Sequence, residues 1–171
     1  KYPQNVFVAG FIGTPQMNFI NAEINVEGDD LSFVATEAPL KIALPKDFFA
    51  KAKQADVFHG KKVVLGLRAE HISIDAKKYT AKAKIKVSHI EELGTESQVF
   101  GDLNFDKELG LQSSTKIVIK APTMTRFEVG SVTEISFDIE NMQVFDAETE
   151  VNLIPRIPDC SSISVVVKNH T

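Results

Sequence analysis

The chain has 171 residues, of which 43% are hydrophobic and 25% charged, a balance typical of a soluble globular protein and not of a disordered or fibrous one. Its net charge of −4 disfavours nucleic-acid binding, which draws affinity from a basic face, and no apolar run approaches the roughly 18 residues of a membrane-spanning helix. The single cysteine, Cys160, excludes an internal disulfide, and without an apolar signal segment it indicates a reducing cytoplasm.

Two segments are expected to be short helices. The apolar run Tyr2–Gly13 has a proline where a helix can start and a glycine where one can stop. In Lys46–Val57, phenylalanines and alanines recur at helical spacing opposite lysines, and Gly60 follows. The rest of the chain is expected to be β-structure.

Period-two alternation predicts the strands. Ala22, Ile24 and Val26 alternate with polar residues, and the turn residues Gly28–Asp30 precede a partner strand over Leu31–Ala35. Further strands are predicted over Val63–Leu67, Lys116–Lys120, Val132–Ile139, Met142–Phe145 and Ile163–Lys168. Many short strands separated by turn residues favour a small barrel or sandwich.

The segment Ala81–Ile90 is predicted to be a strand with a bulge. Its apolar residues alternate with Lys82, Lys84 and Lys86, which we expect to mark a solvated edge strand, and the phase slips at Ser88-His89. The following Glu91–Gly94 is a possible separator between two halves of the domain.

The chain has no recognisable catalytic or metal-binding pattern. Its four histidines are well separated, no G-x-S-x-G elbow occurs, and Cys160 has no neighbouring base. His59–Lys62 resembles the tail of a P-loop, but it lacks the first glycine and the magnesium-binding hydroxyl, so it is not a nucleotide site.

Four motifs, in order, resemble the ATPase subunits of maltose, multiple-sugar and glycerol-phosphate ABC importers, the MalK-like family. The first and most specific is YPQNVFVAGFIGTPQMNF, which follows the nucleotide-binding domain in that family. The others are LGLRAEHI, EELGTES and VFDAET, at Leu65–Ile72, Glu91–Ser97 and Val144–Thr149. Two residues depart from the pattern: Ala69 replaces a proline, and Gln143 replaces a histidine.

The resemblance implies a mainly β regulatory domain of the OB-type (TOBE) barrel kind, built as one barrel or as two intertwined barrel subdomains, with the two short helices. It implies three segments: a junction helix over 1–16, the OB-type/TOBE domain over 17–153, and an unassigned C-terminal extension over 154–171. Because the chain begins at Lys1, we expect it to be a fragment of a transport ATPase whose ATP and Mg²⁺ bind in a missing N-terminal domain.

The resemblance also implies partners. In the family two such domains pair, holding two ATPase subunits together, and offer a docking surface for regulatory proteins. The expected partners are therefore a second copy, the chain's own nucleotide-binding domain, the membrane subunits and regulators, at the inner face of the cell membrane. No nucleic acid and no cofactor are expected on this fragment.

Four residues are candidate interdomain or regulatory contacts. Arg68, Glu70 and His71 follow an apolar strand that does not need them for packing, so they could hydrogen-bond an adjacent domain; the alternative is a local ion pair that closes the loop. Phe19 is the fourth candidate, although Phe19, Met17 and Phe11 are all more simply explained as core residues.

Two functions from different classes remain open. One is the regulatory and dimerisation module just described, without catalysis. The other is a freestanding β-barrel that binds a sugar or an oxyanion, in which Arg68 or lysines would hold the ligand. The sequence does not specify which sugar or which regulator is involved.

Overall fold

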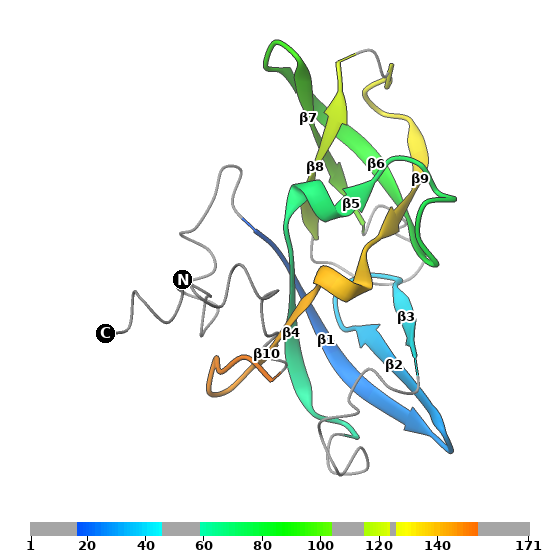
Figure 1. Ribbon diagram of the computed structural model, residues 1–171, viewed down its shortest axis with the longest axis vertical. Helices are drawn as coiled ribbons and strands as arrows, with labels where there is room; N and C mark the ends of the chain where they lie inside the picture. Colours follow the sequence, from blue (N-terminus) through cyan, green and yellow to red (C-terminus); the bar gives the residue numbers. More distant parts are fainter. Residues whose placement is uncertain (1–16, 46–58, 104–114, 124–125, 154–171) are drawn as a thin grey trace, which may run out of the picture.

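The computed structural model describes residues 17–45, 59–103, 115–123 and 126–153, which form two five-stranded sheets. The first sheet has the strand order β10-β4-β1-β2-β3 and the second has the order β5-β9-β6-β7-β8. All pairings are antiparallel. The two sheets follow one another along the long axis of the molecule, with the first sheet at the bottom of the view and the second at the top (Figure 1).

The first sheet confirms the predicted hairpin. Ala22, Ile24 and Val26 lie opposite Ala35, Phe33 and Leu31, and Gly28 adopts a positive φ of 61° in the turn, which a residue with a side chain would adopt only with strain. The strands of this sheet are β1 (Asn18–Glu27), β2 (Asp30–Ala35), β3 (Lys41–Leu44), β4 (Lys62–Leu67) and β10 (Gln143–Asp146).

The second sheet is built around the long strand β6, in which the predicted bulge is confirmed by a register shift between Val87 and His89. The strand changes its partner just before the bulge, since Ala81–Lys86 pair with β9 and Lys86–Glu92 pair with β7. The strands are β5 (Ile72–Ser73), β6 (Ala81–Glu92), β7 (Glu96–Asp102), β8 (Lys116–Pro122) and β9 (Val132–Phe137).

Of two expectations about β6, that of a solvated edge holds for one half of the strand. Its lysines are exposed and lie in the half that pairs with β9, whereas the half from Lys86 onward pairs with β7, so the strand as a whole lies inside its sheet. The second expectation was wrong. Residues Glu91–Gly94 do not separate two halves; they turn β6 into β7, with Leu93 N–H donating to the Glu96 carbonyl at 2.8 Å and Gly94 at a φ of 86°.

The two sheets are intertwined and share one core. The chain leaves the first sheet after β4, builds the second, and returns through a single 3₁₀ turn, η4 (Ile139–Asn141), to add β10 beside β4. Fully buried side chains from both sheets, such as Ile24 and Phe33 from the first and Ile85 and Ile135 from the second, belong to the same cluster. This mainly β architecture is the predicted one.

Other sequence predictions differ at their ends or fall outside the described residues. The strand expected over Val132–Ile139 ends at Phe137. The strand expected over Met142–Phe145 is shifted by one residue to Gln143–Asp146. The two predicted helices and the strand over Ile163–Lys168 lie outside the described residues. Within the described ranges, no helix is long and apolar enough to cross a membrane.

Candidate functional site

The polar residues that follow β4 lie where the chain passes from the first sheet to the second. After Leu67 the backbone makes a single 3₁₀ turn, η2 (Ala69–His71), in which His71 N–H donates to the Arg68 carbonyl at 2.9 Å. Ala69, which stands at the family's proline position, is buried at the start of this turn. The turn contacts β8, so Glu70 and His71 are brought beside the second sheet.

Contacts between ionisable side chains link Glu70 and His71 to three residues of other elements, namely Asp138, Lys120 and Glu96. We call these five residues the strand-end cluster. His71 lies between two carboxylates, with Nδ1 at 3.6 Å from Asp138 and Nε2 at 3.8 Å from Glu70. Lys120 on β8 lies at 4.0 Å from Glu70 and at 3.8 Å from Glu96 on β7. The cluster therefore runs from η4 through η2 to β8 and β7.

These pairs are long and largely exposed. The side chains of Glu70 and Glu96 are 53% and 45% exposed, while that of Asp138 is only 14% exposed. Exposed pairs at such distances typically contribute about 0–1 kcal/mol to stability. The cluster thus has charged groups that another molecule can contact and that contribute little to the stability of the fold. The local pairing that the sequence analysis gave as the alternative is also present.

The other two candidates are Arg68 and Phe19. Arg68 is half-buried in an extended conformation at the start of η2 and makes interactions of its own. Phe19 is half-buried on the outer face of the first sheet, where it packs with Val64 against Met17 and Phe145. Met17 and Phe145 are buried, so the core interpretation holds for Met17, in a small cluster separate from the main core, while Phe11 is outside the described residues.

Asn18 is a structurally important residue that sequence reasoning missed. Its side-chain amide donates to the Val118 carbonyl at 2.9 Å and its oxygen accepts the Val118 N–H at 2.7 Å. The Asn18 side chain therefore makes the two hydrogen bonds that a neighbouring strand would otherwise make with the edge strand β8. These bonds link the first sheet to the second. Its one sequence signal is an amide at the head of an apolar strand, at a position that proves to be buried.

Asp146 is a second missed residue, and it organises the turn after β10. Its carboxylate pairs with Lys61 at 2.7 Å and accepts the N–H groups of Glu148 and Thr149 at 2.8 and 3.2 Å. The hydrogen bond to Lys61, followed by those backbone donors, holds the pKa of Asp146 below its ordinary value of 3.8 against the opposing effect of burial. Because Lys61 is committed to this carboxylate, the geometry does not fit a phosphate loop at His59–Lys62.

A close approach of side chains explains the glycine in the LGLR motif. A Cβ on Gly66 would lie 2.6 Å from the Met17 sulfur and 3.0 Å from a ring carbon of Phe145. Beside it on β10, the buried Oε1 of Gln143 has no hydrogen-bond partner among the described residues. In the described ranges no group of three or more His, Cys, Asp or Glu side chains could hold a metal ion.

Two family models match consecutive parts of the chain. The MalK OB fold domain matches residues 13–72 and the TOBE domain matches residues 65–145. The chain therefore contains a MalK-type OB-fold domain followed by a TOBE domain. The two models overlap at Leu65–Ile72, the segment that carries β4, η2 and the strand-end residues Glu70 and His71.

The relatives of this OB/TOBE chain are ABC transporter ATP-binding proteins. It is 35% identical over 149 residues to the ATP-binding protein YcjV of Escherichia coli O157:H7, covering 87% of this chain and 37% of that protein. It is 30% identical over 147 residues to the maltose/maltodextrin import protein MalK of Vibrio cholerae, and 30% identical over 170 residues to the trehalose import protein SugC of Mycobacterium tuberculosis. These matches cover 86% and 88% of this chain, but only 36% and 41% of those proteins.

A solved structure shares the fold. The cytoplasmic molybdate-binding protein ModG superposes with a TM-score of 0.52 at 15% identity, covering 78% of this chain and 97% of ModG. At that identity the similarity supports the β architecture of the OB/TOBE chain and nothing about its ligand.

Proposed function

We propose that this chain is the C-terminal regulatory and dimerisation domain of the ATP-binding subunit of a carbohydrate ABC importer. The observation that carries the proposal is the pattern of coverage: relatives that are ABC transporter ATP-binding proteins match nearly the whole chain, while the chain spans only 36–41% of their length. The remainder of such a subunit would hold ATP and Mg²⁺ and make the contacts with the membrane subunits.

In this proposal the chain contributes contacts with other domains and proteins, and it does not catalyse a reaction. The core shared by the two sheets provides a platform that carries the strand-end cluster at its surface. We propose that Glu70, His71 and Arg68 meet the nucleotide-binding domain or a regulatory protein, and that Phe19 contributes an apolar contact beside the junction segment. The parent subunit would act at the inner face of the cell membrane.

Exchange of domains tests the proposal. A chimera of Vibrio cholerae MalK, in which residues 13–153 of this chain replace the matching segment, is expressed in cells that lack their own MalK, and maltose uptake is measured. We expect the chimera to restore uptake, and a MalK truncated before this segment, as the control, to fail. A chimera that is folded and membrane-associated but gives no more uptake than the truncated control would contradict the proposal.

The alternative, a freestanding oxyanion or sugar binder, has the similarity to ModG in its favour. That similarity extends to the fold alone. Titration calorimetry of the chain with molybdate and with maltose separates the two functions, since the regulatory module predicts no heat of binding with either. Saturable binding of either ligand would favour the alternative.

A further inference from the structure

The part of the second sheet built by β6, β7 and β8 has an outer face as well as the face that packs into the core. Val99 and Ile119 lie opposite each other on β7 and β8, are both 0% exposed and belong to the main core. Side chains alternate along a strand, so Gln98 and Phe100, on either side of Val99, point away from that core. The residues beside them in register share the outer face.

Two rows of side chains cross this outer face. In one row Gln98 lies between Glu91 on β6 and Lys120 on β8. In the other row Phe100 lies beside His89, and the centroids of the two rings are 5.5 Å apart with the ring planes at 40°. His89 Nε2 lies 3.4 Å from a carboxylate oxygen of Glu91, so the rings and the carboxylate form one surface.

Gln98 is a buried polar side chain in the middle of this surface. It is only 8% exposed, yet its amide makes no hydrogen bond within the part of the chain that the structure describes. Burying an amide costs free energy unless a partner satisfies it. The Gln98 amide therefore has donors and an acceptor to offer to a molecule that covers the outer face.

The tip of the β6–β7 hairpin holds an apolar side chain in solvent beside this surface. Leu93 is 51% exposed, and its N–H donates to the Glu96 carbonyl at 2.8 Å. Thr123, just beyond β8, fixes the tip, since its Oγ1 donates to the Gly94 carbonyl at 2.7 Å. In Figure 1 this turn lies at the end of the molecule far from the first sheet. Leu93 thus offers apolar area next to charged groups, as protein interfaces do.

Carboxylates outnumber cations along the hairpin. Lys120 is shared by Glu70 and Glu96, at 4.0 and 3.8 Å, so one ammonium group serves two carboxylates. Glu91 is 48% exposed, and the exposed Glu92 forms no ion pair within the described ranges. This excess of negative charge repels nucleic acids and anionic lipids and attracts basic partners.

We infer that this surface binds an arginine-bearing basic segment of a partner protein. A guanidinium group can lie flat on the Phe100 ring, donate to the Gln98 amide oxygen and pair with Glu91, which is beside Gln98 in register. Leu93 packs against the apolar part of the same segment, and Glu92 adds charge at the rim. The binding residues, which we call the hairpin face, are Glu91, Glu92, Leu93, Gln98 and Phe100.

The inference rests on the proposed regulatory function and names the chemistry of the partner. Lys120 joins the hairpin face to the strand-end cluster, because it lies beside Gln98 in register and close to Glu70. The contact surface proposed for Glu70 and His71 therefore extends along β8 and β7 to the tip of the hairpin.

Binding of a fluorescein-labelled oligoarginine peptide to the whole 171-residue chain tests the inference, with fluorescence anisotropy as the measurement. At about 150 mM salt we expect saturable binding, which Glu91→Gln with Glu92→Gln should weaken at least ~10-fold in dissociation constant. Gln98→Met keeps a side chain of similar length without the amide and should weaken binding ~3-fold. An oligolysine peptide of the same length should bind ~5-fold more weakly, because an ammonium group neither stacks on a ring nor donates two parallel hydrogen bonds.

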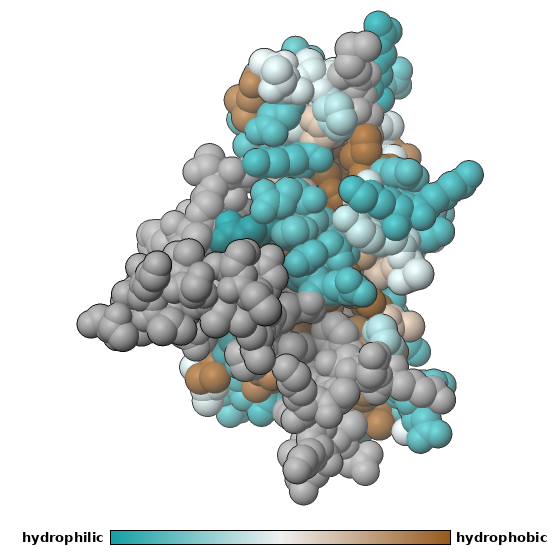
Figure 2. Space-filling model, viewed as in Figure 1, coloured by the Kyte–Doolittle hydropathy of each residue, from teal (hydrophilic) through white to brown (hydrophobic). Residues whose placement is uncertain are grey.

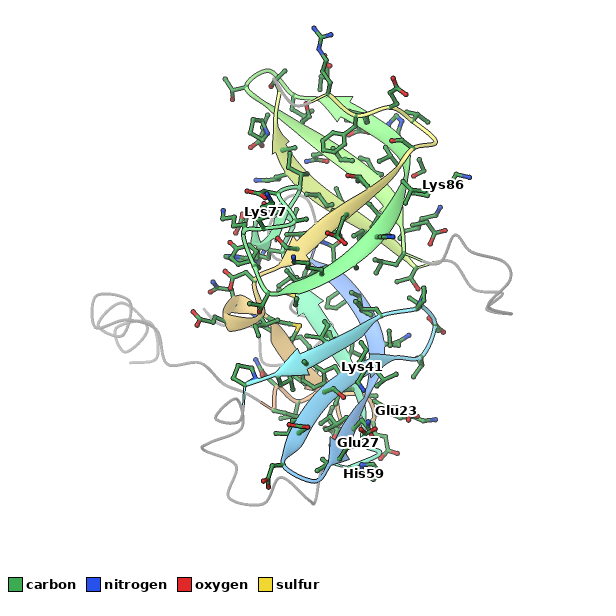
Figure 3. The ribbon with its side chains drawn as sticks, turned by 90° about the vertical axis from the view of Figure 1, so that its right-hand side faces the viewer. Glu23, Glu27, Lys41, His59, Lys77 and Lys86 are labelled. Carbon is green, nitrogen blue, oxygen red and sulfur yellow. The ribbon has the colours of Figure 1, made fainter. Side chains whose placement is uncertain are left out.

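The matched control removes the same charge at the other end of the molecule. Asp29 and Asp30 are exposed in and after the β1–β2 turn, so Asp29→Asn with Asp30→Asn changes the net charge by the same amount. Glu27, which lies opposite Asp30, is in the lower half of Figure 3, whereas Lys86 on β6 is in the upper half. We expect this control to change the dissociation constant by less than about 2-fold, since the two ends are separated by more than the screening length. Circular dichroism melting verifies that every variant is folded.

The outcomes separate this inference from the proposed function. Equal weakening by the two pairs of charge substitutions would show that the peptide follows the net charge, and would overturn the inference. Equal affinity for the arginine and lysine peptides overturns it as well, as do an unchanged affinity of Gln98→Met and a wild-type chain without saturable binding. The uptake experiment with the chimera decides the proposed function whichever of these results is found.

Discussion

The buried residues Asn18 and Asp146 differ from the exposed Glu70 in how completely their polar atoms are hydrogen-bonded. Asn18 and Asp146 are 6% and 8% exposed, and each makes several hydrogen bonds between 2.7 and 3.2 Å. Glu70 is mostly exposed and its ion pairs are 3.8 and 4.0 Å long. A buried polar group needs hydrogen bonds to offset the loss of its contacts with water. An exposed group makes only weak pairs and can exchange them for contacts with another molecule. The first set stabilises the fold, and the second is available for function.

The space-filling view agrees with this division. Figure 2 shows hydrophilic side chains covering much of the middle of the visible face, where the described part of the chain lies uncovered, with hydrophobic residues gathered in smaller areas. The chain thus presents a polar surface over a core built from both sheets.

The largest effect on stability is expected from Asn18→Ala. It would leave the buried N–H and C=O of Val118 without partners, and should lower the free energy of unfolding by about 2–4 kcal/mol in urea denaturation. Asn21→Ala is the matched control, since its amide makes one exposed 3.3 Å bond to Glu37. Equal effects of the two substitutions would show that the link between the sheets contributes no stability.

Asp146→Ala should have the next largest effect. It removes the pair with Lys61 and the acceptor for two backbone N–H groups, and a loss of about 1–3 kcal/mol is expected. Thermal melting measures it, with the exposed Asp29→Ala as the control. A melting temperature that matches the control would mean that the turn after β10 holds its shape without this carboxylate.

The pH dependence of stability sharpens the case for Asp146. Since its pKa is lower in the folded chain than the ordinary 3.8, its stabilising contribution is complete well above that value and is lost as the pH falls through the folded-state pKa. The difference in unfolding free energy between the wild type and Asp146→Asn should therefore be constant above about pH 5 and shrink below about pH 4. A difference that stays unchanged down to pH 2 would rule out this linkage.

The smallest effect on stability is expected from Glu70→Gln. Loss of the Glu70 carboxylate should change the free energy of unfolding by less than about 0.5 kcal/mol, because the pairs that it makes are exposed and long. In the MalK chimera, however, the same substitution should alter the coupling of ATP hydrolysis to uptake, or its inhibition. Unchanged transport and regulation, or a simple loss of folding, would count against the proposed contact role.

Local patterns predicted the parts of the fold that local chemistry determines. The alternation over Ala22–Ala35 and the glycine turn specify a hairpin, and the phase slip at Ser88-His89 specifies the bulge. The return of β10 to β4 depends on contacts between residues far apart in the chain, which periodicity does not encode. Glu91–Gly94 was misread because a tight hairpin turn and a domain boundary share the same turn residues.

The candidate site was predicted in part. Polar residues after an apolar strand drew attention to Arg68, Glu70 and His71. Lys120 and Asp138, which contact Glu70 and His71, and Glu96, which contacts Lys120, come from other strands and turns. Asn18 and Asp146 escaped notice because an amide or a carboxylate gives no sequence signal for the backbone groups that it will meet. Their roles become visible only once the sheets are assembled.

The most direct test of the central claim is the maltose-stimulated ATP hydrolysis of the purified chimeric transporter. If residues 13–153 serve as the regulatory and dimerisation domain, stimulation should approach that of the parent MalK complex and exceed that of the complex made with the truncated subunit. A folded, assembled chimera whose stimulation is no greater than that of the truncated complex would contradict the claim.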